Sequence, residues 1–200
     1  MVISPKYKFA FIANPKTGSK SICLALLNDV KDKKLINEKD YAEKTSFNFN
    51  KHLPCPNLIK QKPQYNNYFK FAFVRNSWHR VVSWYFFEKR VDLWDPERNS
   101  SNISFEEFVS NVEFKKRVWG NENQFQYEFT KGCDFIGRTE NLQSDFNAVC
   151  DKIGIPHQKL LHKNKTKHEH YTEYYDEKTK QIVAKVFKKD IEYFNFKFGE

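Results

Sequence analysis

The sequence predicts a single α/β domain over residues 1–200, with a central parallel sheet flanked by helices on both faces. Short apolar runs alternate with stretches that carry apolar residues at helical spacing, and this alternation is typical of parallel strands joined by helices. The chain has 200 residues, 40% hydrophobic and 17% aromatic. That content is sufficient to bury a core and argues against a disordered chain.

The first predicted strand is the apolar run Lys8–Ala13, which stops at Asn14-Pro15. A turn follows at Lys16–Gly18. Ser19–Val30 is expected to be a helix, because its apolar residues recur every three or four positions. The chain therefore opens with a P-loop-like strand–loop–helix unit, and the polar stretch Lys31–Lys51 predicts a loop or an irregular helix.

A second buried strand, Phe69–Val74, leads straight into Arg75-Asn76-Ser77 and then into a helix. The apolar face of this helix consists of Trp78, Val81, Val82, Tyr85 and Phe86. Asp92–Asn102 predicts a loop. Ser104–Glu107 is a capping box that opens a short helix through Val112.

The third predicted strand is Phe135–Gly137. It precedes a helix from Leu142 to Ile153 that ends at Gly154 and Pro156. His157–Lys167 is a polar, basic connection. Asp176 is expected to cap the last helix, whose apolar face is Ile182, Val183, Val186, Phe187 and Ile191.

Charge and cysteine content narrow the class of protein. Lys and Arg number 34 and Asp and Glu 25, a net charge of +9, which suits either an anionic partner or simply a lysine-rich surface. The apolar runs are far shorter than the ~20 residues of a membrane-spanning helix, and no signal peptide is visible, so we expect a cytoplasmic protein. The four cysteines form no C-x-x-C pair, which argues against a zinc ribbon or a thioredoxin-type site.

The sharpest local feature is the loop from Asn14 to Ser21, between a strand and a helix. Backbone N–H groups at a helix start have no intrahelical acceptor and face the positive end of the helix dipole, so they attract anions. The candidate anion-binding residues are Lys16, Thr17, Gly18, Ser19, Lys20 and Ser21. The Walker A pattern fails, because Ser19 separates Gly18 from Lys20 and position 13 is Ala. An ordinary turn that carries Lys and Ser is the alternative.

The loop PKTGSKSI resembles the 5′-phosphosulfate loop of sulfotransferases that use 3′-phosphoadenosine 5′-phosphosulfate (PAPS). FKFAFVRNSWHRVVSWYFF resembles the family's 3′-phosphate segment, a strand that ends in Arg with a Ser eight residues on; here these are Arg75 and Ser83. FIGRTENLQSDF, over 135–146, and the tail that begins at Asn164-Lys-Thr are also similar. The likeness covers most of the chain and is strongest to the carbohydrate-type branch, which includes the Golgi glycan sulfotransferases and compact bacterial relatives.

The resemblance implies a sulfotransferase fold, PAPS as donor, PAP as product and no metal. It places Lys16 beside the bridging oxygen and Thr17 to Ser21 around the 5′-phosphate. Arg138 and Lys165, with neighbouring Lys163 and Lys167, would close over the nucleotide. Lys20 departs from the family pattern, in which Ser or Thr is usual. The implied acceptor is a hydroxyl, most simply on a saccharide.

The chemistry of Arg75 agrees with this expectation. It leaves a strand at the carboxyl end, where open α/β sheets bind ligands, and its guanidinium offers a planar fork of donors to a phosphate. Ser83 reaches the same anion only if the helix packs beside it, and Arg80 is a third candidate. The alternative is a surface Arg with a small helix-packing Ser.

Sulfuryl transfer also needs a general base, and His is the usual proton acceptor at neutral pH. Of the six His residues, His52 lies in a loop ahead of the second strand, where relatives in this family commonly carry a catalytic His. Its alternative is a loop-surface His. His79 is expected to be structural, whereas His168 and His170 are expected at the surface.

Two other functions stay open from the sequence. A kinase or nucleotide hydrolase would need a Mg²⁺ ligand near the loop, and no clean acidic strand end offers one. A non-enzymatic module for nucleic acid or anionic glycan would expose its aromatics, whereas most of them here fall on apolar helix faces. We therefore expect no nucleic-acid partner; the acceptor and the oligomeric state cannot be read from the sequence.

Overall fold

The computed structural model of the chain describes residues 1–29, 52–91, 103–110, 125–161 and 168–200. These residues form two compact units: unit 1 is Met1–Val74 with Glu128–Lys163, and unit 2 is Arg75–Tyr127 with Asn164–Glu200. Several predicted features lie outside the described residues, namely the loops at 31–51 and 92–102, the helix ends Val30 and Val112, and the lysines Lys163, Lys165 and Lys167.

Unit 1 contains a mixed four-stranded sheet in the order β1-β2-β3-β4. The strands are β1 (Val2–Ser4), β2 (Phe9–Ile12), β3 (Phe69–Val74) and β4 (Phe135–Arg138). β2, β3 and β4 are parallel, so the predicted α/β class with its parallel strands is confirmed. The antiparallel edge strand β1 was not predicted, because three residues are too short to show a period-2 pattern.

The register aligns the carboxyl ends of the parallel strands. Ile12 of β2 is paired with Ala72 of β3, and Val74 of β3 with Arg138 of β4. The loop that begins at Asn14 and the end of β4 therefore emerge at one edge of the sheet. This edge is where open α/β sheets bind their ligands.

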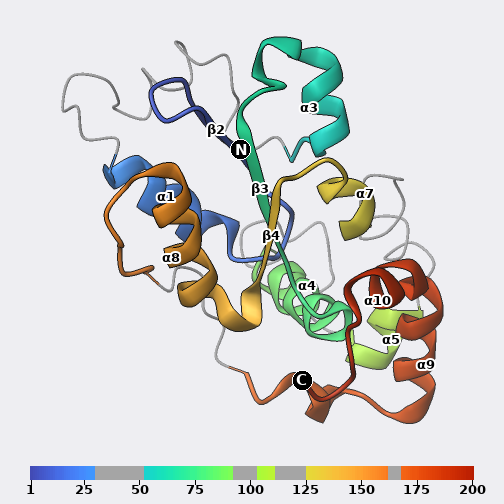
Figure 1. Cartoon of the computed structure of the whole chain (residues 1–200). Helices are drawn as coiled ribbons and strands as arrows, with labels where there is room; N and C mark the ends of the chain where they lie inside the picture. Colours follow the sequence, from blue (N-terminus) through green and yellow to red (C-terminus); the bar gives the residue numbers. More distant parts are fainter. Residues whose placement is uncertain (30–51, 92–102, 111–124, 162–167) are drawn as a thin grey trace. The chain divides into compact units, whose positions relative to one another are not determined.

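Helices cover both faces of this sheet, as predicted (Figure 1). Helices α1 (Ser19–Asp29) and α8 (Leu142–Ile153) pack on the face that carries the aromatic side chains Phe9, Phe11, Phe71 and Phe73. Helix α3 (Cys55–Gln61) and Phe129 of α7 (Gln126–Thr130) pack on the opposite face, with Ala10, Ile12 and Ala72. Alternate residues of each strand thus serve two separate apolar layers.

Helices α3 and α7 were not predicted. Prolines surround the start of α3, and Pro56 stands in its first turn, where the fixed φ of proline suits a helix and its missing N–H costs nothing. Because prolines more often indicate loops, this helix could not be recognised from the sequence. Among the described helices, none is both long and apolar enough to cross a membrane.

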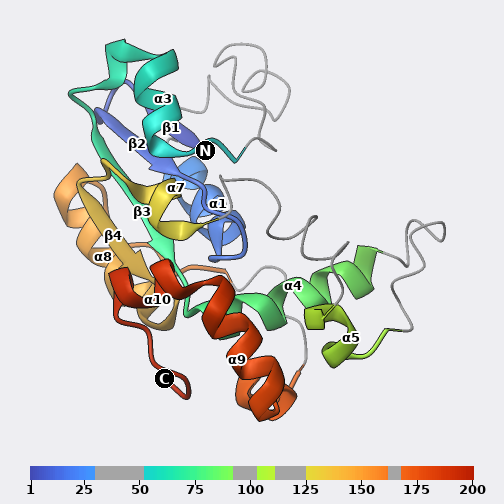
Figure 2. The same ribbon diagram turned by 90° about the vertical axis from the view of Figure 1, so that its right-hand side faces the viewer.

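Unit 2 is helical and aromatic. It contains α4 (Ser77–Val91), α5 (Phe105–Ser110), the 3₁₀ turn η5 (Tyr171–Tyr174), α9 (Glu177–Val186) and α10 (Lys188–Phe194), and Figure 2 shows α4, α5 and α9 side by side. Edge-to-face ring contacts join these elements; the centroids of Phe105 and Tyr175, for example, lie 4.9 Å apart.

The predicted final helix is in fact two helices. The backbone of Phe187 leaves the helical region, with φ −98° and ψ 23°, and separates α9 from α10. Phe187 is buried, and the apolar pattern continues across the break, so helical spacing alone gave no sign of it.

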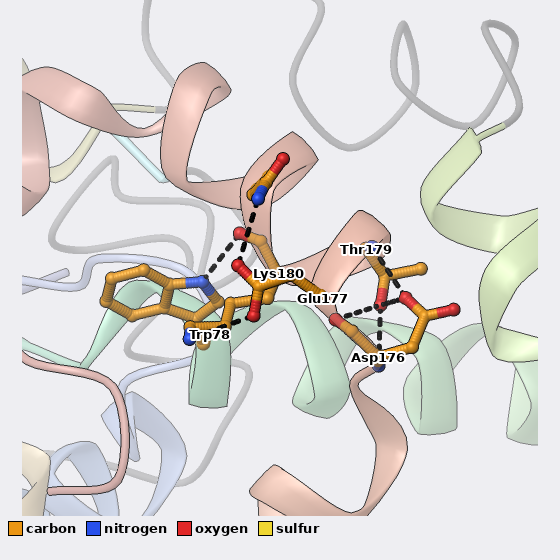
Figure 3. Close-up of polar contacts among 6 residues, drawn as sticks. Trp78, Asp176, Glu177, Thr179 and Lys180 are labelled. Carbon is orange, nitrogen blue, oxygen red and sulfur yellow. Dashed lines mark hydrogen bonds and ion pairs between the residues drawn. The ribbon is translucent and has the colours of Figure 1, made fainter.

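Both predicted helix caps are present. Ser104 Oγ accepts from the Glu107 N–H at 3.1 Å, and Glu107 Oε2 accepts from the Ser104 N–H at 2.7 Å. At the start of α9, Asp176 Oδ1 accepts from the Thr179 N–H at 2.7 Å (Figure 3). The hydrogen bond from the Thr179 hydroxyl is the main reason that the pKa of Asp176 lies below its usual value.

Figure 3 also shows how α9 is tied to α4: Trp78 Nε1 donates to the Lys180 carbonyl oxygen at 3.1 Å.

Gly137 in β4 packs against the ring of Phe73, which is fully buried. A Cβ added to Gly137 would stand 2.5 Å from Phe73 Cε1. We expect Gly137→Ala to lower the free energy of unfolding by about 1–3 kcal/mol, as overpacking of a core does, measured by urea denaturation.

The double variant Gly137→Ala/Phe73→Leu should lose less stability than the sum of its two single variants, because the smaller side chain makes room for the methyl group. Ala148→Ser, at an exposed position of α8, is the control and should change the free energy by under about 0.5 kcal/mol. Additive losses in the double variant would contradict the packing argument.

Candidate functional site

The loop after β2 is built around Asn14, which is buried. Its side-chain amide donates to the Phe73 carbonyl oxygen at 3.1 Å, so it joins the end of β2 to β3. Its own carbonyl oxygen accepts from Thr17 Oγ1 at 2.9 Å and from Ser19 Oγ at 2.5 Å. Each hydroxyl has only one hydrogen to donate, and Thr17 and Ser19 both donate theirs to Asn14. In this arrangement the two hydroxyls stabilise the loop and do not donate to a ligand.

Two left-handed residues turn the chain between β2 and α1. Gly18 has φ +73° and Lys16 has φ +66°. The first is ordinary for glycine, but the second costs a non-glycine residue about 1–2 kcal/mol. Strain of this kind persists where the surrounding structure enforces it, and it is concentrated at functional sites.

The other predicted donors of the loop lie at the beginning of α1. Ser21 donates its backbone N–H to the Gly18 carbonyl oxygen at 3.0 Å, which starts the helix. Thr17 and Ser21 are buried, whereas Lys20 is exposed. A helix start with a lysine on each side is suited to an anion by charge and by its N–H groups.

The structure brings His52 to this loop. His52 Nδ1 lies 2.5 Å from the Ala13 carbonyl oxygen, directly before Asn14, while the His52 side chain is exposed. A carbonyl oxygen can only accept, so Nδ1 carries the hydrogen and Nε2 is the basic nitrogen. This tautomer suits a group that must take up a proton.

Arg138 ends β4 at the same edge of the sheet. Its backbone N–H donates to Asp145 Oδ2 at 2.6 Å. The next residue, Thr139, donates its hydroxyl to the Val74 carbonyl oxygen at 2.9 Å. Side chains thus connect the carboxyl ends of β2, β3 and β4, and unit 1 offers Lys16, His52 and Arg138 from this edge.

Arg75 follows β3 directly and belongs to unit 2. Its backbone is held by Gln126: Gln126 Oε1 accepts from the Arg75 N–H at 2.9 Å, and Gln126 Nε2 donates to the Arg75 carbonyl oxygen at 2.8 Å. Asp190 in turn accepts from the N–H groups of Gln126 and Tyr127, each at 2.9 Å. Gln126 and Asp190 are fully buried, so this support is enclosed in the unit.

The guanidinium of Arg75 meets His79, four residues further along. Arg75 Nη2 contacts His79 Nε2, and the His79 ring stacks on Tyr171 with centroids 5.0 Å apart. Burial lowers the pKa of His79 to about 3, helped by the charge of Arg75 and by His168 and His170. Because the imidazole is neutral, it accepts a hydrogen bond from Arg75. It carries no positive charge that would compete with the guanidinium for an anion.

Gln126 and His79 were not predicted to act at the site. His79 could have been found, because residues four apart on a helix are neighbours. Gln126 lies 51 positions from Arg75, and no local pattern connects them.

The remaining candidates of unit 2 lie on α4. Ser83 is half-buried, about two turns beyond the helix start. Arg80 is fully buried, with its guanidinium 4.2 Å from the Trp84 ring centroid; burial lowers its pKa to about 10, and nearby Asp190 opposes that change. Arg80 therefore belongs to the interior of unit 2.

Ser77 is a candidate site residue that sequence reasoning missed. It is the first residue of α4 and lies two positions after Arg75. Its hydroxyl is buried and, within the described ranges, has no hydrogen-bond partner. A buried donor that is left over at the start of a long helix fits an anionic ligand, so the residues present are compatible with a phosphate group.

The candidate residues of the two units are thus mainly lysines, arginines, hydroxyl side chains and histidines. In the part of the chain that the structure describes, no group of three or more His, Cys, Asp or Glu side chains is arranged to hold a metal ion.

Comparison with known proteins gives two matches. The model of the sulfotransferase family matches residues 1–197. An uncharacterized protein of Archaeoglobus fulgidus is 35% identical over 102 residues, which is 48% of this chain and 77% of that protein. No solved structure matches significantly.

The lowered pKa of His79 predicts a pH effect on stability. The folded state excludes a proton that the unfolded state takes up below about pH 6.5, so stability is lost as the pH falls. Between pH 7.5 and pH 5, His79 alone should lower the free energy of unfolding by about 2 kcal/mol. His79→Gln should reduce the difference in unfolding free energy between these two pH values by about 1–2 kcal/mol, measured by urea denaturation at each pH.

Ala148→Ser, at an exposed position of α8, is the control, and its two curves should follow those of the unsubstituted protein. A His79→Gln variant with the original pH dependence would show that His79 does not titrate as described.

Proposed function

Because the chain belongs to the sulfotransferase family, it transfers sulfuryl groups, and we propose that PAPS is the donor, PAP the product and a saccharide hydroxyl the acceptor. The observation that carries the proposal is the position of His52 against Ala13, which brings an imidazole to the start of the cationic loop. Transfer needs a place for an anionic donor and a base for the acceptor hydroxyl, and unit 1 has a candidate for each at one edge of its sheet.

The loop is proposed to hold the 5′-phosphate. The backbone N–H groups from Thr17 to Ser21 and the side chain of Lys20 would bind its oxygens. Lys16 would lie next to the bridging oxygen and stabilise the charge of the leaving phosphate. The left-handed backbone of Lys16 supports this role, since a strained lysine at that point has no evident benefit for folding.

The 3′-phosphate is proposed to bind Arg75 and Ser83, and Arg138 and Lys165 are proposed as further contacts to the nucleotide. Charge-assisted bonds from a guanidinium are the strong ones in anion binding. Gln126 and His79 support this assignment, because they fix Arg75 at its backbone and at its guanidinium. The buried hydroxyl of Ser77 adds a donor to the same set.

His52 is proposed as the general base. Its Nε2 would accept the proton of the acceptor hydroxyl while the transfer proceeds in line, by analogy with phosphoryl transfer. When bound, PAPS supplies the sulfuryl group and a good leaving group. The protein supplies position, charge and one proton acceptor.

A saccharide acceptor is supported by the resemblance to the carbohydrate-type branch, and the net charge of +9 suits a saccharide that is already acidic. We further propose that residues 1–200 act as one sulfotransferase-like domain, because the family model matches residues 1–197 as one stretch. Family membership favours sulfuryl transfer over the kinase and the non-enzymatic binding module.

Titration calorimetry with PAP in the presence of EDTA tests the donor site. Lys16→Ala and Arg75→Ala should each weaken PAP binding about 10- to 100-fold, the loss expected when one charged hydrogen bond of about 1.5–3 kcal/mol is removed. Lys60→Ala, at an exposed position of α3, is the control and should bind as the unsubstituted protein does.

Lys16→Gly separates binding from folding. It should lose PAP affinity like Lys16→Ala, yet its free energy of unfolding should change by under about 1 kcal/mol, because glycine relieves the left-handed strain and adds entropy to the unfolded chain. Equal PAP binding in all the Lys16, Arg75 and Lys60 variants would end the case for this donor site.

The base is tested separately. His52→Gln should lower kcat about 100- to 10,000-fold, the usual contribution of general base catalysis, with PAP affinity within about twofold of the original. Turnover is measured with PAPS and a saccharide acceptor on which the unsubstituted protein is active. Unchanged turnover in His52→Gln would remove His52 from the mechanism; His157→Gln is the control.

A further inference from the structure

Two of the four cysteines lie together in unit 1. Cys55 is the first residue of α3 and is fully buried, and Cys133 is half-buried in the turn before β4. Cys133 packs against the apolar cluster that contains Cys55, and a Cβ placed on neighbouring Gly132 would lie 3.8 Å from Cys55 Sγ. Cys23 and Cys150 are buried in the apolar cluster on the other face of the sheet.

The backbone around Cys133 is fixed. The Cys133 N–H donates to the Thr130 carbonyl oxygen at 2.9 Å, and the Asp134 N–H donates to the Lys70 carbonyl oxygen at 2.7 Å. The Lys70 N–H returns a bond to Asp134 Oδ2 at 2.7 Å. Cys55 is fixed by the first turn of α3, so both sulfurs are carried by ordered elements rather than by free loops.

The surroundings favour loss of one proton from the pair. The hydrogen bond from Cys133 lowers the pKa of the Cys55 thiol, although burial opposes this, and the nearby Lys70 ammonium adds to the effect. The same bond raises the pKa of Cys133. Thiolate character at one member and a proton on the other is the arrangement of reactive dithiols, because the thiolate is the nucleophile.

We propose that Cys55 and Cys133 form a redox-active dithiol that a hydroperoxide oxidises to an intramolecular disulfide. One thiolate attacks an oxygen of hydrogen peroxide; the O–O bond breaks, and the departing hydroxide takes up a proton to give water and a sulfenic acid. The second thiol then attacks the sulfenic sulfur, the S–S bond forms and a second water leaves. Two electrons pass from the sulfurs to the peroxide, and a thiol reductant reverses the change.

The position of the pair gives the modification a route to the site. Cys55 follows His52 with only Leu53 and Pro54 between them, and Cys133 stands just before the strand that ends in Arg138. A disulfide would therefore tie the segment that carries His52 to the segment that leads to Arg138. The dithiol itself does not depend on the proposed sulfuryl transfer; only its effect on turnover would.

The test is peptide mapping of the purified full chain after treatment with hydrogen peroxide and alkylation of the remaining thiols. Trypsin cuts after Lys51, Lys60, Lys131 and Arg138, so the expected product is a disulfide-linked pair of peptides, 52–60 with 132–138, that dithiothreitol separates. Because the pair is detected in the unsubstituted protein, the result does not depend on how well any variant folds.

Variants sharpen the assignment. Cys133→Ser should abolish the linked pair, whereas Cys23→Ser and Cys150→Ser should keep it. The proposal is overturned if peroxide leaves both thiols open to alkylation, if sulfinic acid accumulates at Cys55 or Cys133 without the cross-link, or if either one links instead to Cys23, to Cys150 or to a second chain. Loss of PAP binding in the earlier variants bears only on the transfer site, so the two conclusions can fail independently.

Discussion

The hydrogen bonds of buried Asn14 are the constraint on which the candidate site depends. Its amide nitrogen holds the end of β2 to the Phe73 carbonyl oxygen, and its carbonyl oxygen accepts the hydroxyls of Thr17 and Ser19. These bonds fix where the strand stops and how sharply the chain turns into α1. A buried polar group without partners is costly, so the same bonds that shape the loop also stabilise it.

That arrangement explains why several candidate site residues of unit 1 share one edge of the sheet. Once β2, β3 and β4 are in register, the loop after β2 and the end of β4 emerge at one edge of the sheet. His52 is added to this edge by its contact with the carbonyl oxygen of Ala13. The site is therefore a consequence of strand alignment, with turns and side-chain bonds that set the details.

Most of the fold could be predicted from the sequence because the pattern reflects burial directly. Phe9 and Phe11 alternate with small or aliphatic residues along β2, and α1 and α8 show apolar residues at helical spacing. β1 is too short for a pattern, prolines hid α3, and the break at Phe187 lies inside a continuous apolar face. Helix boundaries set by tertiary packing are not encoded locally.

The candidate site divides in the same way. The loop from Lys16 to Ser21 could be recognised because its residues are consecutive and their chemistry is explicit. The left-handed backbone of Lys16 and the hydrogen bonds from two hydroxyls to the Asn14 carbonyl oxygen could not be recognised from the sequence. They depend on atoms that only the folded chain brings together. Gln126 was invisible for a simpler reason: its partner, Arg75, is far away in the chain.

The bonds between Gln126 and Arg75 have one more consequence. A primary amide has both a donor and an acceptor, so this one side chain occupies the peptide N–H and C=O of the residue beyond β3, as the backbone of an adjacent strand would. The two hydrogen bonds to Arg75 thus resemble the backbone pairing of a β-sheet, one residue after β3 ends. A glutamate at position 126 would place a carboxylate oxygen, which cannot donate, against the Arg75 carbonyl oxygen. An asparagine side chain is one methylene shorter and would not reach both backbone groups. Of these three side chains, only glutamine can make both hydrogen bonds.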